Sequence, residues 1–376
     1  MRKKRLMSPG PTPVPEKVLL KMADTIIHHR TPQFKAVLKD VHAKLKKVFC
    51  TKNPVFVLAS SGSGAMEASV VNLLSKGDKA LVVRGGKFGG RFAEISEAYG
   101  IEVVTYDVKW GEAADPSIVE KMLKDDPSIK VVFSTLCETS TGVVHDIEAI
   151  AAVTSKTDAV IVVDAISGLS ADELRVDGWG VDVAVCGSQK GLMLPPGLGF
   201  LSLSSKAEKL VERSDLPKYY FDLAAAKKAH DRDDTPWTPA ISLIMGLNEV
   251  LDMLLEEGVD NVLTRHARLA EITREAVKAM GLELFSSSPS NAVTSVKVPE
   301  GVDGTALVKK MRDEQGVTIA GGQAELKGKI FRVGHLGYMD GFDTITTIAG
   351  IEMVLTQLGY DMELGKGVAK AQEMLK

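Results

Sequence analysis

The sequence predicts an α/β protein built on a central, mainly parallel sheet of seven strands, followed by a smaller C-terminal α+β domain. Short β-branched runs alternate with segments of helical periodicity, the pattern of strands and helices stacked on a parallel sheet. The run Ala159–Val163 is apolar on both faces, as in a strand buried within such a sheet. From Ile241 the chain becomes strongly helical until Gly258. We therefore expect a large domain over residues 18–258 and a small domain over residues 259–376.

The start of the chain is rich in proline. Four prolines fall within residues 8–15, and each fixes φ and removes a backbone donor. Such a segment cannot be a helix or a central strand. We therefore expect residues 1–17 to form an extended N-terminal arm.

Seven short segments carry the strand pattern of the expected sheet. They are residues 55–59, 80–83, 102–106, 130–134, 159–164, 181–186 and 199–203. Helices are expected among them at residues 65–75, 91–99 and 145–154. The C-terminal part is expected to contain helices from Ile241 to Gly258 and through Met280, a strand at 293–298, a helix at 305–314, a strand at 330–333 and a final long helix.

Composition places the chain among globular proteins. Of its 376 residues, 45% are hydrophobic and 25% are charged, which leaves enough apolar side chain for a substantial core. A formal net charge of -3 lacks the basic excess of nucleic-acid-binding proteins, so we expect no nucleic-acid partner. No window approaches the roughly 18 consecutive apolar residues of a membrane span, so we expect none.

Cysteine and histidine usage indicates the compartment. Cys50, Cys137 and Cys186 are an odd number of cysteines without metal-type spacing, which favours a reducing cytoplasm. The basic run at residues 2–5 lacks the apolar stretch that follows in a signal peptide. The only close histidine pair, at residues 28–29, would point to opposite sides of a strand. We expect a cytoplasmic protein without a bound metal.

Lys190 directly follows the end of an expected strand. It lies among small residues in segment 186–191 and precedes an apolar Pro-Pro-Gly turn at residues 195–197. Partial desolvation and nearby cations would lower the pKa of its amine and expose a nucleophile. A solvated lysine in a surface loop is the alternative that this stretch alone leaves open.

Asp164 ends the apolar strand that begins at Ala159. Its carboxylate therefore stands at the carboxyl end of a central strand, the edge at which open α/β sheets bind ligands. A carboxylate there can pair with a protonated pyridine nitrogen, which lets pyridoxal phosphate (PLP) act as an electron sink. Capping a helix or binding magnesium are the open alternatives.

The segment Ser-Ser-Gly-Ser-Gly at residues 60–64 lies between a strand and the helix expected from Ala65. Small residues let backbone amides approach an anion, and a helix N-terminus adds partial positive charge, so this loop suits a phosphate. The spacing is neither that of Walker A nor GxGxxG, which disfavours a nucleotide. A plain turn is the alternative.

Three further segments are unusual for their positions. Phe88 is flanked by glycines at residues 84–90, where a flat ligand could stack on it or where it could fill a local gap. Residues 138–142 offer hydroxyls at the same sheet edge. Arg332 stands in an otherwise apolar strand, as a clamp for a carboxylate or as part of a structural salt bridge.

Taken in order, these segments resemble the class V aminotransferases of PLP fold type I, specifically the alanine–glyoxylate, serine–glyoxylate and serine–pyruvate group. The resemblance covers almost the whole chain. Its motifs are Ser8-Pro9-Gly10-Pro11-Thr12, His28-His29-Arg30-Thr31-Pro32, Ser61-Gly62-Ser63-Gly64, Lys87-Phe88-Gly89, Glu138-Thr139-Ser140-Thr141-Gly142, Val163-Asp164, Ser188-Gln189-Lys190-Gly191 and Phe331-Arg332-Val333-Gly334.

This resemblance implies roles at a PLP site. Lys190 would form the Schiff base with PLP and shuttle protons, while Asp164 would pair with the pyridine nitrogen. Phe88 takes the position of the stacking aromatic, and Thr139 would bond the region of the cofactor's 3-oxygen. The cofactor-binding residues so implied are Ser61, Gly62, Ser63, Phe88, Thr139, Asp164, Ile166, Gln189, Lys190, Thr235 and Thr238.

The resemblance also implies a substrate site and a partner. Arg332 would grip the substrate's α-carboxylate, with Gly10 and Thr139 beside it. The segment around Thr235 and Thr238 matches a family segment that reaches the phosphate of the neighbouring subunit. A homodimer with active sites at the subunit interface is therefore implied, and the choice between the two threonines stays open.

The function implied is a ping-pong transamination from a small L-amino acid, serine or alanine, to a 2-oxo acid such as glyoxylate or pyruvate. Phosphoserine or broad-specificity transamination is an alternative. Phe88 and Ser63 depart from the tryptophan and histidine found in some relatives, which bears on the substrate. A cysteine desulfurase or lyase is disfavoured because Gln189, and not histidine, precedes Lys190. A non-catalytic accessory subunit would require a silent lysine.

Overall fold

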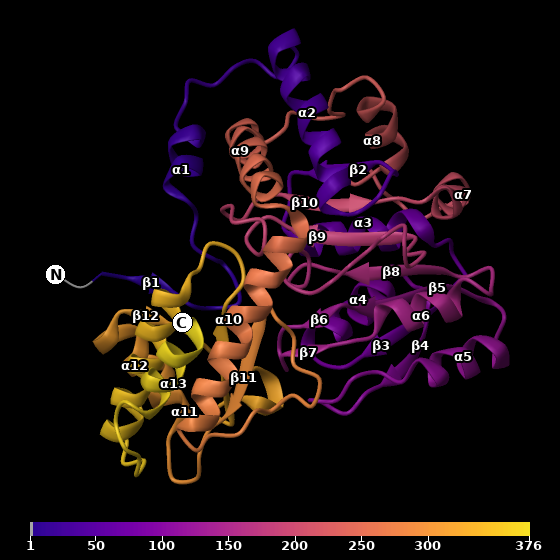
Figure 1. The fold of residues 1–376 in the computed structure, drawn as a ribbon. Helices are drawn as coiled ribbons and strands as arrows, with labels where there is room; N and C mark the ends of the chain where they lie inside the picture. The colour runs from indigo at the N-terminus through magenta and orange to yellow at the C-terminus, as the bar shows by residue number, and fades with distance from the viewer. Residues whose placement is uncertain (1–2) are drawn as a thin grey trace.

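A seven-stranded sheet forms the centre of the larger part of the molecule (Figure 1). The computed structural model describes residues 3–376, so residues 1–2 of the expected arm lie outside the described residues. Its strands, in spatial order, are β2 (Val55–Leu58), β10 (Gly199–Ser202), β9 (Val183–Gly187), β8 (Val160–Asp164), β5 (Ile129–Thr135), β3 (Lys79–Arg84) and β4 (Glu102–Asp107). Strand β10 runs opposite to the other six strands of this sheet, which all point in the same direction. The predicted mainly parallel sheet of seven strands is confirmed.

Both faces of the sheet are buried, which explains the continuous apolar runs in its strands. Alternate residues of each strand enter two separate hydrophobic clusters, as Ile161 and Val162 of β8 do. The helices on one face are α1 (Glu16–Met22), α2 (Pro32–Val48), α5 (Pro116–Asp125), α6 (Ile147–Thr154) and α9 (Ile241–Glu257). Those on the other are α3 (Gly62–Leu73), α4 (Lys87–Ala98), α7 (Ser205–Arg213) and α8 (Leu223–His230).

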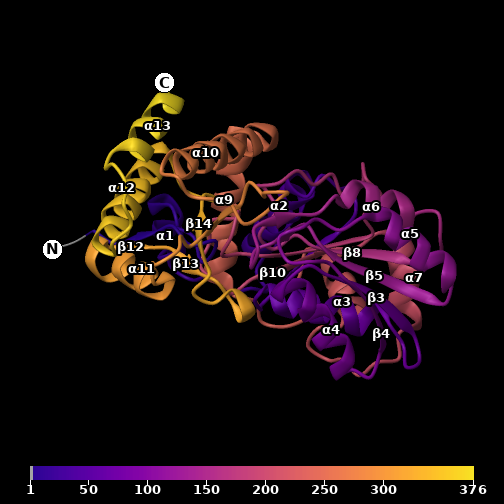
Figure 2. The ribbon, with the colours of Figure 1, turned by 90° about the horizontal axis from the view of Figure 1, so that it is seen from below.

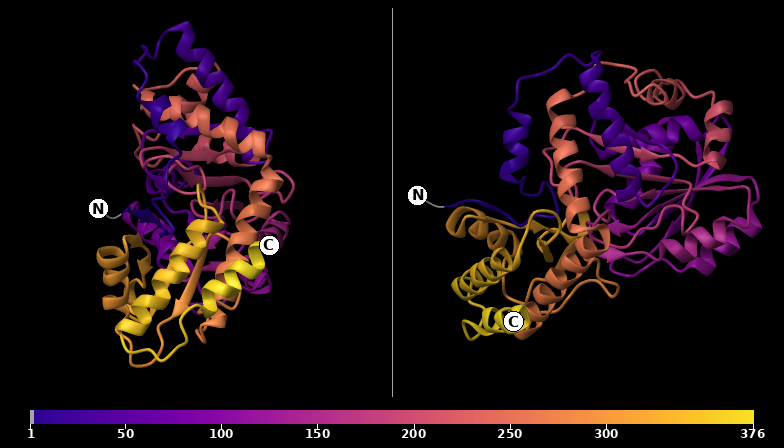
Figure 3. Two further views of the ribbon diagram at one scale, coloured as in Figure 1. Left: turned by 60° about the vertical axis from the view of Figure 1, so that its left-hand side comes forward. Right: turned by 45° about the horizontal axis from the view of Figure 1, so that its top comes forward.

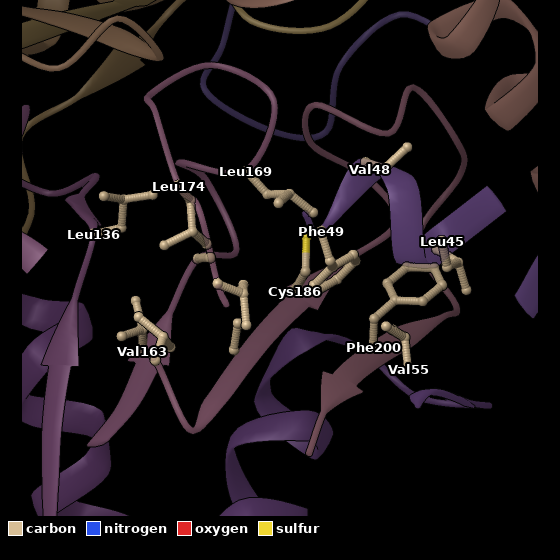
Figure 4. Close-up of a cluster of buried hydrophobic side chains, with 14 of the residues drawn as sticks. Leu45, Val48, Phe49, Val55, Leu136, Val163, Leu169, Leu174, Cys186 and Phe200 are labelled. Atoms are coloured by element: carbon tan, nitrogen blue, oxygen red, sulfur yellow. The ribbon is translucent and has the colours of Figure 1, made fainter. Parts of the chain in front are cut away.

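The first cluster fixes the end of α2 over the sheet. In Figure 4, Leu45 and Phe49 lie beside Val55 and Phe200, which belong to the neighbouring strands β2 and β10. The cluster continues to Cys186 and the loop that follows β8. The strand ends that carry the candidate site therefore rest on a packed layer.

The C-terminal part is a smaller body with its own hydrophobic cluster, beside the sheet (Figures 2 and 3). Its three-stranded antiparallel sheet has the order β11 (Val293–Lys297), β14 (Ile330–Gly334) and β13 (Ala320–Gly321). Its helices are α10 (Val259–Ala279), α11 (Gly304–Lys310), α12 (Gly341–Gln357) and α13 (Lys366–Leu375). The start of the arm joins this body, because β1 (Arg5–Leu6) pairs with β12 (Val317–Thr318).

Several elements differ from the sequence expectations. The final long helix is in fact two, α12 and α13, since Gly359 and Gly365 adopt positive φ between them. The helix expected at 305–314 is α-helical only to Lys310 and then continues as a π-helical turn. The arm becomes helical at Glu16. Helices α1, α2, α5, α7 and α8 were not expected from the sequence pattern. No helix within residues 3–376 is long and apolar enough to cross a membrane.

Replacing Phe200 tests the packing in Figure 4. The Phe200 ring is fully buried, so Phe200→Ala should leave a cavity and lower the free energy of unfolding by about 3–5 kcal/mol. Phe342→Ala is the control, because Phe342 is 79% exposed and its loss should change stability by no more than about 0.5 kcal/mol. Urea unfolding followed by circular dichroism measures both; equal destabilisation by the two variants would contradict the packing.

Candidate active site

A cavity lies where the carboxyl ends of the parallel strands meet. It contains about 450 Å³ of empty space, part of it open to solvent. Nine of the residues implied by the resemblance line it together with Arg91 and Ser167. The full lining is Ser61, Gly62, Ser63, Phe88, Arg91, Thr139, Asp164, Ile166, Ser167, Gln189 and Lys190. The structure thus gathers most of the residues singled out in the sequence at one place.

Lys190 reaches this cavity from the loop after β9. Its Nζ donates a hydrogen bond of 2.6 Å to the Pro9 carbonyl oxygen, so the N-terminal arm supplies its partner. Burial lowers the pKa of Lys190 to about 8, even though Cys137 and Asp164 act to raise it. A neutral carbonyl does not hold the amine in its charged form as a carboxylate would. A substantial fraction of the amine is therefore a neutral nucleophile near pH 8.

Asp164 is the last residue of β8, and it lies opposite Thr135 in β5 and Val185 in β9. One carboxylate oxygen accepts the Ile166 backbone N–H at 2.8 Å. Burial raises the pKa of Asp164 to about 7, against the opposing effect of that hydrogen bond. The site therefore favours a partner that brings positive charge to this carboxylate.

The loop Ser61–Ser63 lies at the N-terminus of α3. Ser61 is the N-cap residue, yet its side chain makes no capping hydrogen bond. The Gly64 N–H donates to the Ser61 carbonyl, but the N–H groups of Gly62 and Ser63 are left for an anion, which the helix dipole also favours. Beside them, Oε1 of Gln189 is buried without a hydrogen-bond partner among the described residues. The backbone N–H groups of the loop can bind an anion, whereas Gln189 Oε1 is an acceptor whose own hydrogen bond is not made.

Phe88 is held in place by a buried carboxylate. Glu138 is fully buried and accepts hydrogen bonds from the backbone N–H groups of Phe88, at 3.0 Å, and Gly89, at 2.8 Å. Ser140 Oγ accepts the Lys87 N–H at 3.0 Å. Burial raises the pKa of Glu138, which these donors oppose. Segment 138–140 thus caps the first turn of α4 and fixes the aromatic ring at the cavity.

The same segment connects the cavity to Arg332. Thr139 Oγ1 donates to Ser167 Oγ at 2.6 Å, while the Thr139 carbonyl accepts Nη1 of Arg332 at 2.6 Å. Nε and Nη2 of Arg332 donate to the Gly321 carbonyl. Burial lowers the pKa of Arg332 to about 10, so it stays charged at neutral pH. Of its five N–H donors, the two not used by these carbonyls are free to bind a carboxylate.

Four of the expected site residues lie outside the cavity lining. Arg332 is one contact away through Thr139. A Cβ built on Gly10 would come within 2.5 Å of Nζ of Lys190, so only glycine permits the arm to pack there. Thr235 and Thr238 line a different cavity beside β2.

Three contributors were missed in the sequence. Arg91 and Ser167 line the cavity, and Pro9 provides the carbonyl that Lys190 contacts. Arg91 follows Phe88 by one helical turn, which is a usable signal once Phe88 is placed at the site. The position of Pro9 depends on a contact across 181 residues of sequence.

The residues present fit PLP. The cavity combines a half-buried amine for an aldehyde, a carboxylate for a ring nitrogen, an aromatic ring and free backbone N–H donors at the start of α3 for a phosphate. Within residues 3–376, no group of three or more metal-ligating side chains lies close enough together to hold an ion.

Solved structures share this fold over nearly the full chain. Ureidoglycine–glyoxylate aminotransferase from Bacillus subtilis superimposes with a TM-score of 0.96 at 29% identity, covering 100% of this chain and 98% of that one. Alanine–glyoxylate aminotransferase from Nostoc sp. gives a TM-score of 0.91 at 29% identity, covering 94% and 96%. The fold is therefore that of the PLP-dependent aminotransferases.

Sequence comparison gives the family. The profile of Aminotransferase class-V matches residues 5–334. An L-aspartate–glyoxylate aminotransferase from Paracoccus denitrificans is 39% identical, over 97% of this chain and 94% of its own. A serine–glyoxylate aminotransferase from Methylorubrum extorquens is 38% identical, over 99% and 96%, and a soluble hydrogenase small subunit from Synechococcus sp. is 42% identical, over 99% and 98%. The chain belongs to the class V aminotransferase family and is an enzyme of the transaminase type, as the sequence predicted.

The pH dependence of Lys190 acetylation tests its environment. In cofactor-free protein, acetic anhydride should label Lys190 with a midpoint near pH 8, because the neutral amine forms above its lowered pKa. The exposed Lys109 is the internal control, since its ion pair with Glu112 raises the pKa of that amine. Peptide mass spectrometry against pH follows both. Coincident midpoints would contradict the lowered pKa of Lys190.

Proposed function

We propose that this chain binds PLP in the cavity around Lys190 and moves the amino group of a small L-amino acid, serine or alanine, to a 2-oxo acid, glyoxylate or pyruvate. The observation that carries the proposal is the pair of ionisable groups, half-buried Lys190 and buried Asp164, that adjacent strands bring to one cavity. When bound, PLP supplies an aldehyde carbon and a ring that accepts electrons from the substrate's α-carbon.

The residues of the chain have separate tasks in this proposal. Lys190 Nζ is the nucleophile and afterwards carries a proton to and from the substrate carbon. Asp164 would pair with the protonated ring nitrogen, and Phe88 would stack on the ring. Arg332 orients the substrate through its carboxylate, with Thr139 between the two sites. Glyoxylate as acceptor is supported by the names of the relatives.

Two alternatives receive less support. For a cysteine desulfurase, the buried thiols are poor nucleophiles, because burial raises the pKa of Cys186 to about 12 and that of Cys137 as well. For an accessory subunit, the support is the names of two relatives, from Synechococcus sp. and Anabaena cylindrica, as hydrogenase subunits. The Lys190 amine, with its lowered pKa, is instead suited to chemistry. Phosphoserine transamination, the third alternative, is tested below by including phosphoserine among the amino donors.

The assembly and location are part of the proposal. A homodimer is supported by exposed aromatic rings next to Thr235 and Thr238, where Tyr219, 74% exposed, stacks on Trp237. A cytoplasmic location is supported by three cysteines that form no disulfide.

Lys190→Ala tests the covalent step. After PLP is added and borohydride reduces the protein, the wild type should carry a PLP adduct on Lys190 by peptide mass spectrometry, and the variant none. Transamination should fall by at least about 10²–10⁴-fold, because both nucleophile and proton carrier are lost. Donors are L-serine, L-alanine, L-aspartate and phosphoserine; acceptors are glyoxylate, pyruvate and 2-oxoglutarate. Lys87→Ala is the control, since Lys87 pairs with Glu94 outside the cavity. Near wild-type turnover by Lys190→Ala would refute the proposal.

Asp164→Asn tests the ring-nitrogen contact. Losing a hydrogen bond to a charged partner should weaken PLP binding by about 10- to 100-fold and lower turnover further. Equilibrium dialysis and initial rates measure the two effects. Asp107→Asn, an exposed change in the pair with Arg84, should leave both unchanged. Unaltered PLP affinity in Asp164→Asn would rule out the contact.

A further inference from the structure

Arg91 is a cation of the cavity that has no carboxylate partner. It lies on α4 and lines the cavity between Ser63 and Phe88. Its Nη1 donates to Ser63 Oγ at 3.0 Å, and its Cζ lies 5.0 Å from the centre of the Phe88 ring. The guanidinium is therefore fixed at the end of the cavity formed by the loop Ser61–Ser63.

Neighbouring cations differ from Arg91 in this respect. Arg84, at the end of β3, pairs with Asp107, and Lys87, on the same helix, pairs with Glu94. Among the described residues, the hydrogen-bond partner of Arg91 is a neutral hydroxyl. Its positive charge is thus not balanced by a protein carboxylate in direct contact, and most of its N–H donors remain available.

In the proposed function, the phosphate of the cofactor has no positively charged partner among the residues assigned so far. The ionisable side chains that line the cavity are Arg91, Asp164 and Lys190. In the proposed function, Lys190 reacts with the aldehyde and Asp164 faces the ring nitrogen. A phosphate ester carries a charge of about -1.5 to -2 at pH 7, and the donors of the loop Ser61–Ser63 and of Gln189 are neutral. Arg91 is the remaining cation of the lining.

We propose that Arg91 binds the phosphate group of the cofactor and balances its charge. This inference rests on the proposed function and adds a residue to it. Arginine suits the task because its guanidinium donates several hydrogen bonds to phosphate oxygens at once. Ser63 orients the guanidinium, and the contact with Phe88 keeps the side chain against the wall of the cavity.

The experiment compares two ligands that differ only in the phosphate. PLP and pyridoxal are each titrated into cofactor-free wild type, Arg91→Gln and Arg91→Lys, and binding is followed by absorbance. Arg91→Gln should weaken PLP binding by about 10- to 100-fold, the loss expected for hydrogen bonds to a charged group, and change pyridoxal binding by less than about twofold. Arg91→Lys should keep part of the PLP affinity, because it retains the charge without the fork of donors.

The control is Arg84→Gln, which removes a nearby positive charge outside the cavity and should leave both affinities unchanged. Equal losses for PLP and pyridoxal in Arg91→Gln would overturn the proposal, because Arg91 would then act only through Phe88. Unchanged PLP affinity would also overturn it. If wild type binds neither ligand, the proposed function fails. Titration with inorganic phosphate then tests Arg91 by itself. Weaker phosphate binding by Arg91→Gln than by wild type supports the anion site, and equal binding refutes it.

Discussion

The placement of one half-buried amine and one buried carboxylate at a single sheet edge is the constraint on which the rest of the site depends. Asp164 ends β8 and Lys190 follows β9, the parallel strand beside it. Burial raises the pKa of the acid to about 7 and lowers that of the amine to about 8. Both groups therefore exchange protons near neutral pH, which isolated side chains of these types do not.

The surroundings preserve this balance by giving each group a neutral partner. Lys190 donates to a carbonyl oxygen, and Asp164 accepts a backbone N–H. A carboxylate in contact with the amine would favour its charged form and reduce its nucleophilicity. The other buried ionisable side chains, Glu138 and Arg332, are held mainly by backbone groups. They fix the positions of Phe88 and Thr139 while leaving the amine reactive.

Much of this arrangement could be predicted because strand ends are readable in a sequence. Asp164 and Lys190 follow apolar strands, and parallel strands deliver their carboxyl ends to one edge, so their meeting follows from the pattern. Arg91 lies on an ordinary helical face, and its place in the cavity lining depends on the position of α4, whose first turn donates to Glu138. The contact of Pro9 with Lys190 depends on the path of the arm, which no local pattern specifies. The break between α12 and α13 depends on two glycines within a run that is otherwise compatible with helix.

The N-terminal arm contacts both Lys190 and the strand that carries Arg332. Gly334, two residues after Arg332, donates its N–H to the Met7 carbonyl at 2.7 Å, and a Cβ at Gly334 would come within 2.5 Å of the Ser8 carbonyl. The arm then passes Pro9 to the Lys190 amine, and Thr12 Oγ1 donates to the Lys190 carbonyl at 2.9 Å. Strand β14 therefore supports both Arg332 and the segment that contacts Lys190. Because the two positions share this support, the placement of the small body against the sheet edge sets the distance between Arg332 and Lys190, which the proposed function requires to match an amino acid.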